Sequence, residues 1–429
     1  MSVTFPFFRI TKNVKFKEFN IFGFKFKILR QSYRQAFWHQ KQLDKRYQNK
    51  IQNIRNFPRI IRIGFLVCHI QKWKCQSVFD QFAKEKEFHP IIVVTPIFKK
   101  HNDKLNDVLH RMNEIIDYCK ENNLDYLVSW DYKNKKVKSL RNFNLDVIFY
   151  EQPWGINREH RIIETSKNSL TCYVPYFVPN YGNLNYDCRP FHFELFRYYV
   201  LSESWKDYYL TEMPNCEDKL RAVGHPFLDF FIENNPLNLH NFIIFAPHHS
   251  LGSDSIGYST FDWSGLEILK FATQHPYFNW IFKPHPALKD TLREKGFMSD
   301  TEISNYWDSW SKIGRVYEGG EYLPYFNDSQ CLITDCGSFL VEYFYTGNPV
   351  IYLISGKAKP PCQALNEIID CYYKATNKDS LNLALKDLLI HKNDPLKIYR
   401  NEKLVNIKRN QSKASIEIVN DIKNTLGLT

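Results

Sequence analysis

The sequence predicts an α/β protein made of two Rossmann-like domains that face each other, with a basic N-terminal arm and helices at the C-terminal end. Short apolar runs alternate with stretches of helical periodicity, which indicates βαβ units and parallel sheets. The alternation pauses near residue 234 and then restarts, and 429 residues leave room for two domains of ordinary size. We therefore expect an arm over 1–57, a first domain over 58–233 and a second domain over 234–429.

The arm is defined by its charge. Residues 1–57 contain 13 Lys/Arg and two acidic residues, whereas the rest of the chain is balanced. Phenylalanines alternate with lysines in it, as in Phe24-Lys25-Phe26-Lys27. Aromatic rings favour the lipid headgroup layer, and a basic residue near an anionic leaflet contributes about 1 kcal/mol. We expect the arm to bind an anionic membrane surface; a solvated tail or a strand covering the first domain is the alternative. Without a nucleic-acid-binding motif, nucleic acid is not an expected partner.

The first domain starts with a short apolar run of the kind that forms a buried parallel strand. Helical spacing of apolar residues follows after each early strand, which favours βαβ connections. The predicted strands are Ile61–Cys68, Pro90–Thr95, Tyr126–Ser129 and Val147–Tyr150, and the predicted helices are Ser77–Lys86 and 105–116.

The second domain repeats the pattern after a linker that begins with Asn-Asn-Pro. Ligands of open parallel sheets bind beyond the carboxyl ends of the strands, so we expect the site there. The predicted strands are Phe242–Ala246, Phe278–Phe282, Cys331–Thr334 and Val350–Leu353, and the predicted helices are Ser264–Thr273, Phe339–Tyr345, Ser380–Leu389 and Ala414–Leu426.

The cysteines and the apolar runs bear on the compartment. The 10 cysteines form no C-x-x-C pair, no secretory signal precedes them, and no run reaches the ~18 apolar residues of a membrane span. These features favour reduced thiols in a cytoplasmic protein that lies on the inner face of a membrane. Neither a P-loop nor a G-x-G-x-x-G is present, and we expect no cofactor.

A strand that ends at Thr334 runs through Asp335 into a tight turn before a helix. Free backbone N–H groups at a helix start attract anions, and Gly337 lets a phosphate approach them. Ser338 can add its hydroxyl, and Glu342 lies one turn further on the same helix face, where it could accept ribose hydroxyls. An ordinary N-cap serine beside a solvated glutamate is the alternative.

Histidines follow two other strands of the second domain. His285 lies between two prolines, and an imidazole can hydrogen-bond a diphosphate or offset charge on a leaving nucleotide. In an extended segment the side chain of Lys283 points to the opposite side. His248 and His249 should diverge, so that at most one of them faces the site. Their spacing from His285 does not suit zinc, and we expect no metal.

Four segments in one order carry a resemblance. They are Gly224-His225-Pro226-Phe227-Leu228-Asp229, Phe245-Ala246-Pro247-His248, Phe282-Lys283-Pro284-His285-Pro286, and Ile333-Thr334-Asp335-Cys336-Gly337-Ser338 with Glu342. They are similar to the G-x-P-R-x-D, A-P-T, R/K-P-H-P and I-T-D-Y-S-S motifs of the CDP-glycerol glycerophosphotransferase family. These are the teichoic acid and capsule polymerases, which have a GT-B fold. The match covers roughly residues 220–355.

The resemblance implies a donor site in the second domain. His285 would meet the diphosphate of CDP-glycerol or a similar nucleotide donor, with His248, Lys283 and Thr334 beside it. Ser338, Gly337 and the adjacent backbone would cradle phosphate, and Glu342 would hold the ribose. Asp335 resembles a turn-forming residue more than a catalytic one.

The chain departs from the family pattern at several positions. Gly337 replaces one serine, His248 replaces the threonine of A-P-T, and Phe227 replaces an arginine. The family's W-H-G motif, whose histidine is its proposed base, corresponds to Glu151-Gln152-Pro153-Trp154-Gly155, which contains no histidine. These changes leave the donor and the base open.

Three residues of the first domain are candidates for the base that takes the acceptor's proton. They are His69, at the end of the first strand, Glu151 and His160. A base must reach the acceptor hydroxyl and hold a suitable pKa. His69 is the first choice because a strand end points towards the expected cleft, although it could also be a plain loop histidine.

The sequence thus predicts a transferase of bacterial envelope polymer synthesis. It would move glycerophosphate, or a related polyol phosphate, from a CDP-activated donor to a hydroxyl of a glycan or lipid-linked acceptor. Glycosyl transfer from a nucleotide sugar in capsule or lipopolysaccharide synthesis is the main alternative, and a nucleotide-sugar epimerase of the same fold is a weaker one. A membrane-bound scaffold with a degenerate fold would bind no nucleotide.

Overall fold

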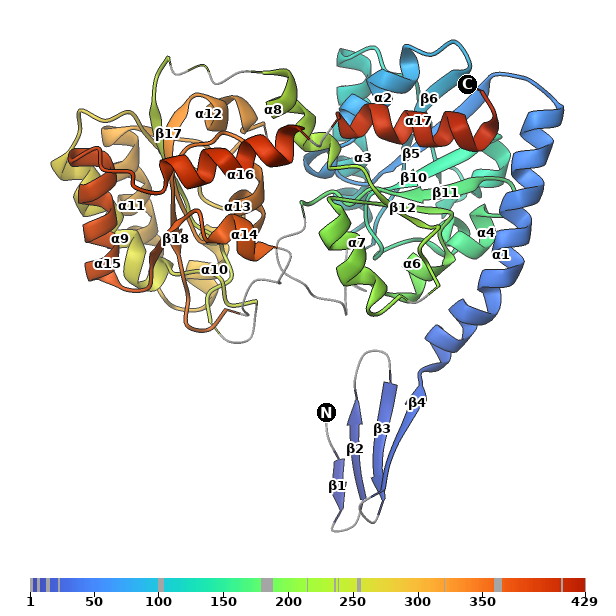
Figure 1. Ribbon diagram of the computed structural model, residues 1–429, viewed down its shortest axis with the longest axis horizontal. Helices are drawn as coiled ribbons and strands as arrows, with labels where there is room; N and C mark the ends of the chain where they lie inside the picture. The colour runs from blue at the N-terminus through green and yellow to red at the C-terminus, as the bar shows by residue number, and fades with distance from the viewer. Residues whose placement is uncertain are drawn as a thin grey trace. The chain divides into compact units, whose positions relative to one another are not determined.

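The computed structural model divides into two compact units, each built on a parallel sheet (Figure 1). The first unit comprises residues 1–177, 183–227 and 413–429, and the second comprises 178–182 and 228–412. For residues before Lys27 the backbone alone is described. The structure describes residues 3–5, 8–12, 16–21, 24–98, 104–178, 188–213, 215–234, 237, 239–252, 256–319, 321–358, 365–409 and 412–428.

The first unit contains a seven-stranded sheet of order β13-β12-β11-β10-β5-β6-β7, in which all pairs are parallel. Its central strands are buried along almost their whole length, as expected where helices cover both faces of a sheet. The strands are β5 (Ile61–Val67), β6 (Phe88–Val94), β7 (Tyr126–Val128), β10 (Val147–Tyr150), β11 (Leu170–Tyr173), β12 (Arg197–Val200) and β13 (Leu220–Ala222), and β8 (Trp130–Asp131) pairs with β9 (Lys136–Val137) apart from them.

Helices from distant parts of the sequence pack on this sheet. The apolar side chains of α1, α2, α3 and α17 join those of the strands in one core. The helices of the first unit are α1 (Gln31–Asn56), α2 (Gln76–Ala83), α3 (Leu105–Glu121), α4 (Ile162–Thr165), α6 (Pro190–Glu194), α7 (Glu203–Leu210) and α17 (Ala414–Leu426).

The N-terminal arm divides into two structures. Its first part is a four-stranded antiparallel sheet of β1 (Val3–Phe5), β2 (Phe8–Lys12), β3 (Phe16–Ile21) and β4 (Phe24–Leu29). Its second part is the helix α1, which is not an extended arm but a packed element of the first unit. The Tyr47 hydroxyl lies 2.6 Å from the Thr171 hydroxyl, and Lys50 pairs with Asp146 at 2.8 Å.

The last helix returns to the first unit. Asp421 of α17 accepts hydrogen bonds from the guanidinium groups of Arg197 (3.0 Å) and Arg221 (3.3 Å) and from the Tyr199 hydroxyl (2.8 Å). The expectation that the terminal helices all belong to the second domain therefore differs from the structure, in which α17 completes the first core. The units also divide between Phe227 and Leu228, slightly before the expected boundary at 233.

The second unit contains a six-stranded parallel sheet of order β16-β15-β14-β17-β18-β19. Figure 1 shows α9, α11 and α15 on one side of β17 and β18, and α13 and α14 on the other. The strands are β14 (Phe242–Ala246), β15 (Trp280–Phe282), β16 (Arg315–Val316), β17 (Ser329–Thr334), β18 (Val350–Leu353) and β19 (Tyr373–Ala375). The helices are α8 (Asp229–Glu233), α9 (Phe261–Gln274), α10 (Leu288–Glu294), α11 (Asp300–Ile313), α12 (Leu323–Asn327), α13 (Gly337–Phe344), α14 (Asn366–Ile369), α15 (Lys378–Leu385) and α16 (Lys397–Arg409).

Among the described residues, no helix is both long enough and apolar enough to cross a lipid bilayer.

Candidate functional site

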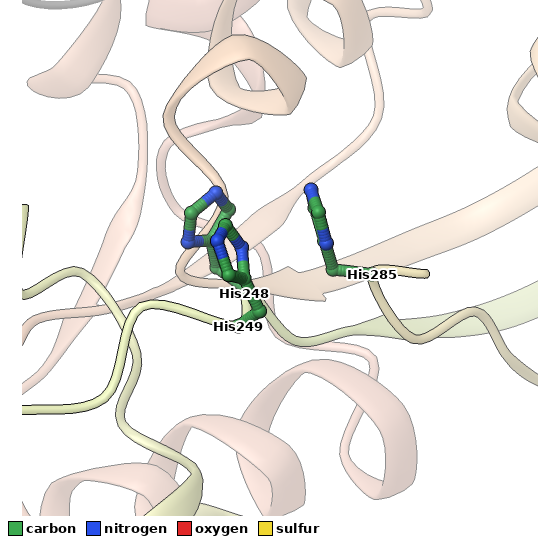
Figure 2. Close-up of side chains that lie close together, drawn as sticks. All are labelled: His248, His249 and His285. Carbon is green, nitrogen blue, oxygen red and sulfur yellow. The ribbon is translucent and has the colours of Figure 1, made fainter. Parts of the chain in front are cut away.

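Three histidines come together in the second unit, beyond the carboxyl ends of β14 and β15 (Figure 2). The ring centroid of His285 lies 4.1 Å from that of His249 and 5.0 Å from that of His248. The expectation that His248 and His249 diverge is therefore wrong: the chain leaves the extended conformation after Pro247, and the two ring centroids lie 4.4 Å apart. One nitrogen of each ring lies within 4.8 Å of the others.

Backbone donors fix the tautomer of two of these rings. The N–H of Ser250 donates to Nδ1 of His248 (3.2 Å), and the N–H of Ala287 donates to Nδ1 of His285 (3.1 Å). A backbone N–H can only donate, so both Nδ1 atoms are acceptors and each neutral ring carries its proton on Nε2. The pair thus offers two Nε2–H donors to a ligand.

This tautomer favours an anion over a metal. Histidines that ligate a metal donate their other ring N–H to a carbonyl or carboxylate. His248 and His285 do the reverse, because their Nδ1 atoms accept. The distances alone would allow a cation, but the hydrogen bonds prepare the Nε2 atoms of these two rings for an acceptor such as a phosphate oxygen.

Burial keeps the three rings neutral. Burial lowers the pKa of His285 to about 3, with the neighbouring His249 and Lys283 adding to the effect. Burial also lowers the pKa of His248 well below its ordinary value, and that of His249, beside Lys295, to a lesser extent. Nδ1 of His249 is buried without a hydrogen-bond partner among the described residues. A bound anion would supply the missing interactions and favour protonation.

Asp335, at the end of β17, links the loop after β14 to the residue before α9. Its carboxylate accepts the N–H of His248 (2.6 Å), the N–H of Thr260 (2.7 Å) and the Thr260 hydroxyl (2.9 Å). Burial raises its pKa to about 7, against the lowering effect of these bonds. The expectation of a turn-forming rather than catalytic residue agrees with this geometry, in which Asp335 ties the loop after β14 to the start of α9.

The start of α13 lies next to Asp335. The Thr334 hydroxyl donates to the carbonyl of Ala246 (2.6 Å) and accepts the N–H of Cys336 (2.9 Å), which closes the ends of β17 and β14. Gly337 begins the helix, and the Ser338 hydroxyl lies 3.6 Å from the Cys336 sulfur. No side chain caps this helix start, so its backbone N–H groups remain suited to an anion.

Lys283 and Glu342 are more buried than the sequence indicated. The Lys283 ammonium donates to the carbonyl of Gly319 (3.1 Å) and lies 4.8 Å from the centre of the Tyr322 ring. The Tyr322 hydroxyl donates to Glu342 (2.6 Å), whose side chain is almost inaccessible. A ribose would reach Glu342 only if Tyr322 moved or shared this carboxylate.

His160, in the first unit, already uses both ring nitrogens. Its Nε2 donates to the carbonyl of Lys138 (3.0 Å), so that Nδ1 accepts the Thr95 hydroxyl (3.1 Å). The Tyr150 hydroxyl donates to the His160 carbonyl (2.7 Å), and burial lowers the pKa of the ring. In this arrangement the ring is a structural group rather than a base.

Glu151 follows β10 and lines a pocket of about 30 Å³ with Cys68, Thr95, Trp154 and His160. Its carboxylate is buried, and the backbone N–H of Lys74 is near enough to favour its charged form. Burial raises its pKa well above the ordinary range, although Lys72 and Lys74 lower it in part. A raised pKa favours the protonated carboxyl, which can donate a proton but not accept one, and this disfavours Glu151 as the base in this conformation.

His69 follows β5 and is half-buried, with Nδ1 3.2 Å from the side-chain oxygen of Gln71. His69, Glu151 and His160 all belong to the first unit, and the donor-binding candidates all belong to the second. Sequence reasoning missed Thr260, gave Tyr322 no role of its own and undervalued His249. Only the sequence position of His249 beside His248 could have drawn attention to it.

Comparisons with known proteins give a fold and no family. No protein-family model matches the chain, and no curated protein matches its sequence. The solved structure of Staphylococcus aureus MnaA with UDP is 12% identical, with a TM-score of 0.54 over 86% of this chain and 98% of that one. UDP-GlcNAc 2-epimerase from Neisseria meningitidis, bound to UDP-GlcNAc, is 14% identical, with a TM-score of 0.51 over 86% and 100%.

The wall teichoic acid polymerase TagF is more distant, with 13% identity and a TM-score of 0.48 over 92% of this chain and 98% of that one. At such identities the likeness to the two epimerase structures concerns the fold alone. Together with the two parallel sheets, it shows that this chain has a two-domain α/β architecture of the GT-B type.

Proposed function

We propose that the chain is a transferase of cell-envelope polymer synthesis whose second unit binds the diphosphate of a CDP-activated polyol such as CDP-glycerol. The observation that carries this proposal is the pair of Nε2–H donors of His248 and His285 beside the uncapped start of α13. The residues come from the ends of three neighbouring strands, β15, β14 and β17, where ligands of open parallel sheets bind.

The donor chemistry follows from these groups. Imidazole N–H donors and helix-start N–H groups both complement phosphate oxygens. Phosphate charge next to three neutral rings would raise their pKa values and favour an imidazolium, which stabilises the leaving nucleotide. The motif order over 220–355, which resembles CDP-glycerol glycerophosphotransferases, favours a cytidine nucleotide over others.

The proposed reaction is a phosphoryl transfer. The acceptor hydroxyl oxygen attacks the phosphorus that carries the glycerol, the bond from that phosphorus to the bridging oxygen breaks, and CMP leaves. The hydroxyl proton passes to a base, for which His69 is the best of the three candidates, because both ring nitrogens of His160 are bonded and burial raises the pKa of Glu151. The acceptor is a hydroxyl of a glycan or lipid-linked chain.

Glycosyl transfer from a nucleotide sugar is the second candidate. The structures that share this fold include two solved with UDP or UDP-GlcNAc, and the same diphosphate site would suit either class of donor. In that case the acceptor attacks the anomeric carbon and the whole nucleoside diphosphate leaves.

Thermal shift with a nucleotide panel tests the proposal. CDP, CMP, CDP-glycerol, CDP-ribitol, UDP, UDP-sugars and CMP-sugars are compared on the full chain, on His285→Ala and on His391→Ala, whose exposed histidine lies elsewhere in the second unit. A ligand at 100 times its Kd stabilises by about 2.7 kcal/mol. We expect CDP-alcohols to stabilise the wild type and His391→Ala equally and His285→Ala less.

The other outcomes separate the candidates. Stabilisation by UDP or UDP-sugars alone would assign glycosyl transfer instead. Absence of any nucleotide effect would contradict an enzyme of either class and leave the scaffold interpretation.

A further inference from the structure

The outer side of α1 carries a row of basic residues that includes an exposed tryptophan. The buried residues of this helix, from Tyr33 to Ile54, face the first unit, where α1 packs on α6 and α17 (Figure 1). Residues at spacings of four, three and four lie in one line along a helix, because 3.6 residues make a turn. On the side away from the core this outer row consists of Arg34, Trp38, Lys41 and Lys45, and all four are exposed.

Contacts divide the six basic residues of α1 into two groups. One group bonds to the rest of the first unit: Arg46 to the Ile163 carbonyl (3.1 Å), Lys50 to Asp146 (2.8 Å) and Arg55 to the Thr425 carbonyl (2.9 Å). The other group belongs to the outer row, and its three side chains make no ion pair or hydrogen bond with a described residue. Asp44, the one acidic residue of the helix, pairs with Lys219 (2.8 Å). The outer row therefore presents three cations and no anion to its surroundings.

Trp38 distinguishes this row from an ordinary solvated helix face. Its exposed fraction is 66%, and the one ring that it meets among the described residues is the imidazole of the adjacent His39, at 5.4 Å between centroids. An indole is large and apolar with a single polar N–H, a combination that favours the boundary between lipid headgroups and hydrocarbon. Arg34 lies one turn before Trp38 and Lys41 one turn after it, so that cations flank the ring along the helix.

We propose that this outer row lies on an anionic lipid surface, with Trp38 among the headgroups and the three cations beside lipid phosphates. The apolar face of α1 is already buried in the first unit, so the helix lies along the surface and does not insert that face. One aromatic residue and three cations make the contact reversible, since each basic residue near an anionic leaflet strengthens binding about fivefold. Binding of this kind does not depend on which donor the second unit takes.

Three other partners fit the row less well. Single-stranded nucleic acid binds in grooves where several aromatic rings stack on successive bases, whereas this row has one ring on the convex side of a helix. A soluble polyanion would neutralise the cations but would leave Trp38 without an apolar environment. A second copy of the chain would place one basic row against another, which like-charge repulsion opposes.

Sedimentation with sucrose-loaded vesicles tests the proposal on the full chain. The vesicles contain phosphatidylcholine and phosphatidylglycerol, and vesicles of phosphatidylcholine alone are the neutral reference. We expect binding to the anionic vesicles that weakens as salt is added, because salt screens exposed charges. Lys41→Gln with Lys45→Gln should weaken the partition coefficient about thirtyfold, or about fivefold for each cation, and should also reduce its salt dependence.

Matched charge variants locate the effect. Lys41→Arg with Lys45→Arg keeps the charge and should bind as the wild type does. Lys133→Gln with Lys135→Gln removes the same charge from the exposed turn between β8 and β9 and should have little effect. Donor-induced thermal stabilisation, if the proposed function holds, should be the same in all of these variants, which separates this proposal from that one.

Variants of Trp38 test the apolar part of the contact. Trp38→Ser should weaken the partition coefficient at least about tenfold, whereas Trp38→Phe keeps a ring and should retain most of the binding. The exposed position should leave the melting temperature of both variants unchanged. Vesicles with brominated acyl chains should quench the fluorescence of the wild type more than that of Trp38→Phe, because Trp38 is the one of the nine tryptophans that would lie at the lipid.

Four results would overturn the proposal. They are no vesicle binding by the wild type, equal binding by the wild type and Trp38→Ser, equal losses in the two glutamine pairs, and equal quenching of the wild type and Trp38→Phe. Tight binding of polyuridine or inorganic polyphosphate in place of vesicles would assign the row to a soluble polyanion instead.

Discussion

Two His-Pro pairs, His225-Pro226 in the first unit and His285-Pro286 in the second, form the same local turn. In each, the histidine Nδ1 accepts the N–H of the residue two positions on, at 3.2 Å from Phe227 and 3.1 Å from Ala287. The rings differ in what their Nε2 atoms meet. Nε2 of His225 donates to the carbonyl of Pro175 (2.8 Å), whereas Nε2 of His285 has no partner among the described residues and lies beside two more imidazoles. A motif can therefore fix a tautomer while the surroundings decide whether the ring is structural or binds a ligand.

Donor affinity should show the largest difference between the two pairs. His285→Ala removes a hydrogen bond to a charged group, which typically contributes about 1.5–3 kcal/mol, or roughly 10- to 150-fold in Kd. His225→Ala should leave the Kd for a CDP-alcohol within about twofold, and titration calorimetry measures both. If both variants lost CDP-alcohol affinity to a similar extent, the difference between the Nε2 atoms of His225 and His285 would not explain donor binding.

Folding stability should show the reverse order. His225→Ala leaves the Pro175 carbonyl without its donor in a buried site, at a cost of about 1–3 kcal/mol. Both variants leave one backbone N–H without its acceptor, that of Phe227 or that of Ala287, but His285→Ala leaves no carbonyl without its donor and should cost less. Urea midpoints of the two variants test this, and equal destabilisation would place His285 among the structural histidines.

Acid should unfold the protein through both rings. Burial lowers the pKa of His225 to about 4 and that of His285 to about 3, so between these values and 6.5 the unfolded chain binds more protons. Stability from each ring is present above pH 6.5 and lost as the pH falls towards the folded pKa. Either alanine variant should lose less stability than the wild type between pH 7 and 5.

Asp335 changes the pH dependence of folding stability in the opposite direction. Its pKa in the folded protein is raised to about 7, so its contribution to stability is lost as the pH rises. The pH test therefore compares each variant with the wild type over the same pH range. If the free energy of unfolding fell with pH as steeply in both variants as in the wild type, the two rings would have ordinary pKa values in the folded protein.

The tautomers give the smallest but most direct signal. Nitrogen chemical shifts of the imidazoles should place the proton on Nε2 in both His225 and His285 at pH 8. Zinc should then bind the three-histidine cluster weakly, since two of its Nε2 atoms are protonated. A proton on Nδ1 of His285, or tight zinc binding that blocks CDP-alcohol binding, would replace the anion site with a metal site.

Much of the fold was predictable because buried parallel strands leave a strong apolar signal. Phe242–Ala246 and Val350–Leu353 match β14 and β18 to the residue, whereas α13 begins at Gly337, two residues before the predicted start at Phe339. The helix α1 was missed because its charge concealed its periodicity. Its buried residues recur at spacings of three, four and seven: Tyr33, Ala36, Leu43, Tyr47, Ile51 and Ile54.

The positions of the candidate residues along the fold were predictable, but their contacts were not. The sequence places His285 and Ser338 after two strands of the second domain, and in the structure they follow β15 and β17. The approach of His249 to His285, the three bonds of Asp335 and the bond from Tyr322 to Glu342 all join residues far apart in the sequence or depend on a bend after Pro247. No local pattern encodes such contacts, since they depend on how the loops pack.

The return of α17 to the first unit has a consequence for biosynthesis. A ribosome releases the strands of the first sheet early, yet Arg197, Tyr199 and Arg221 meet Asp421 only after some 200 further residues have been made. Residues 228–412, which form nearly all of the second unit, lie within that interval and can fold before α17 is made. The unit whose strands are synthesised first is therefore completed after the second one, and a chain that stops before Ala414 lacks the side chains that α17 adds to the first core.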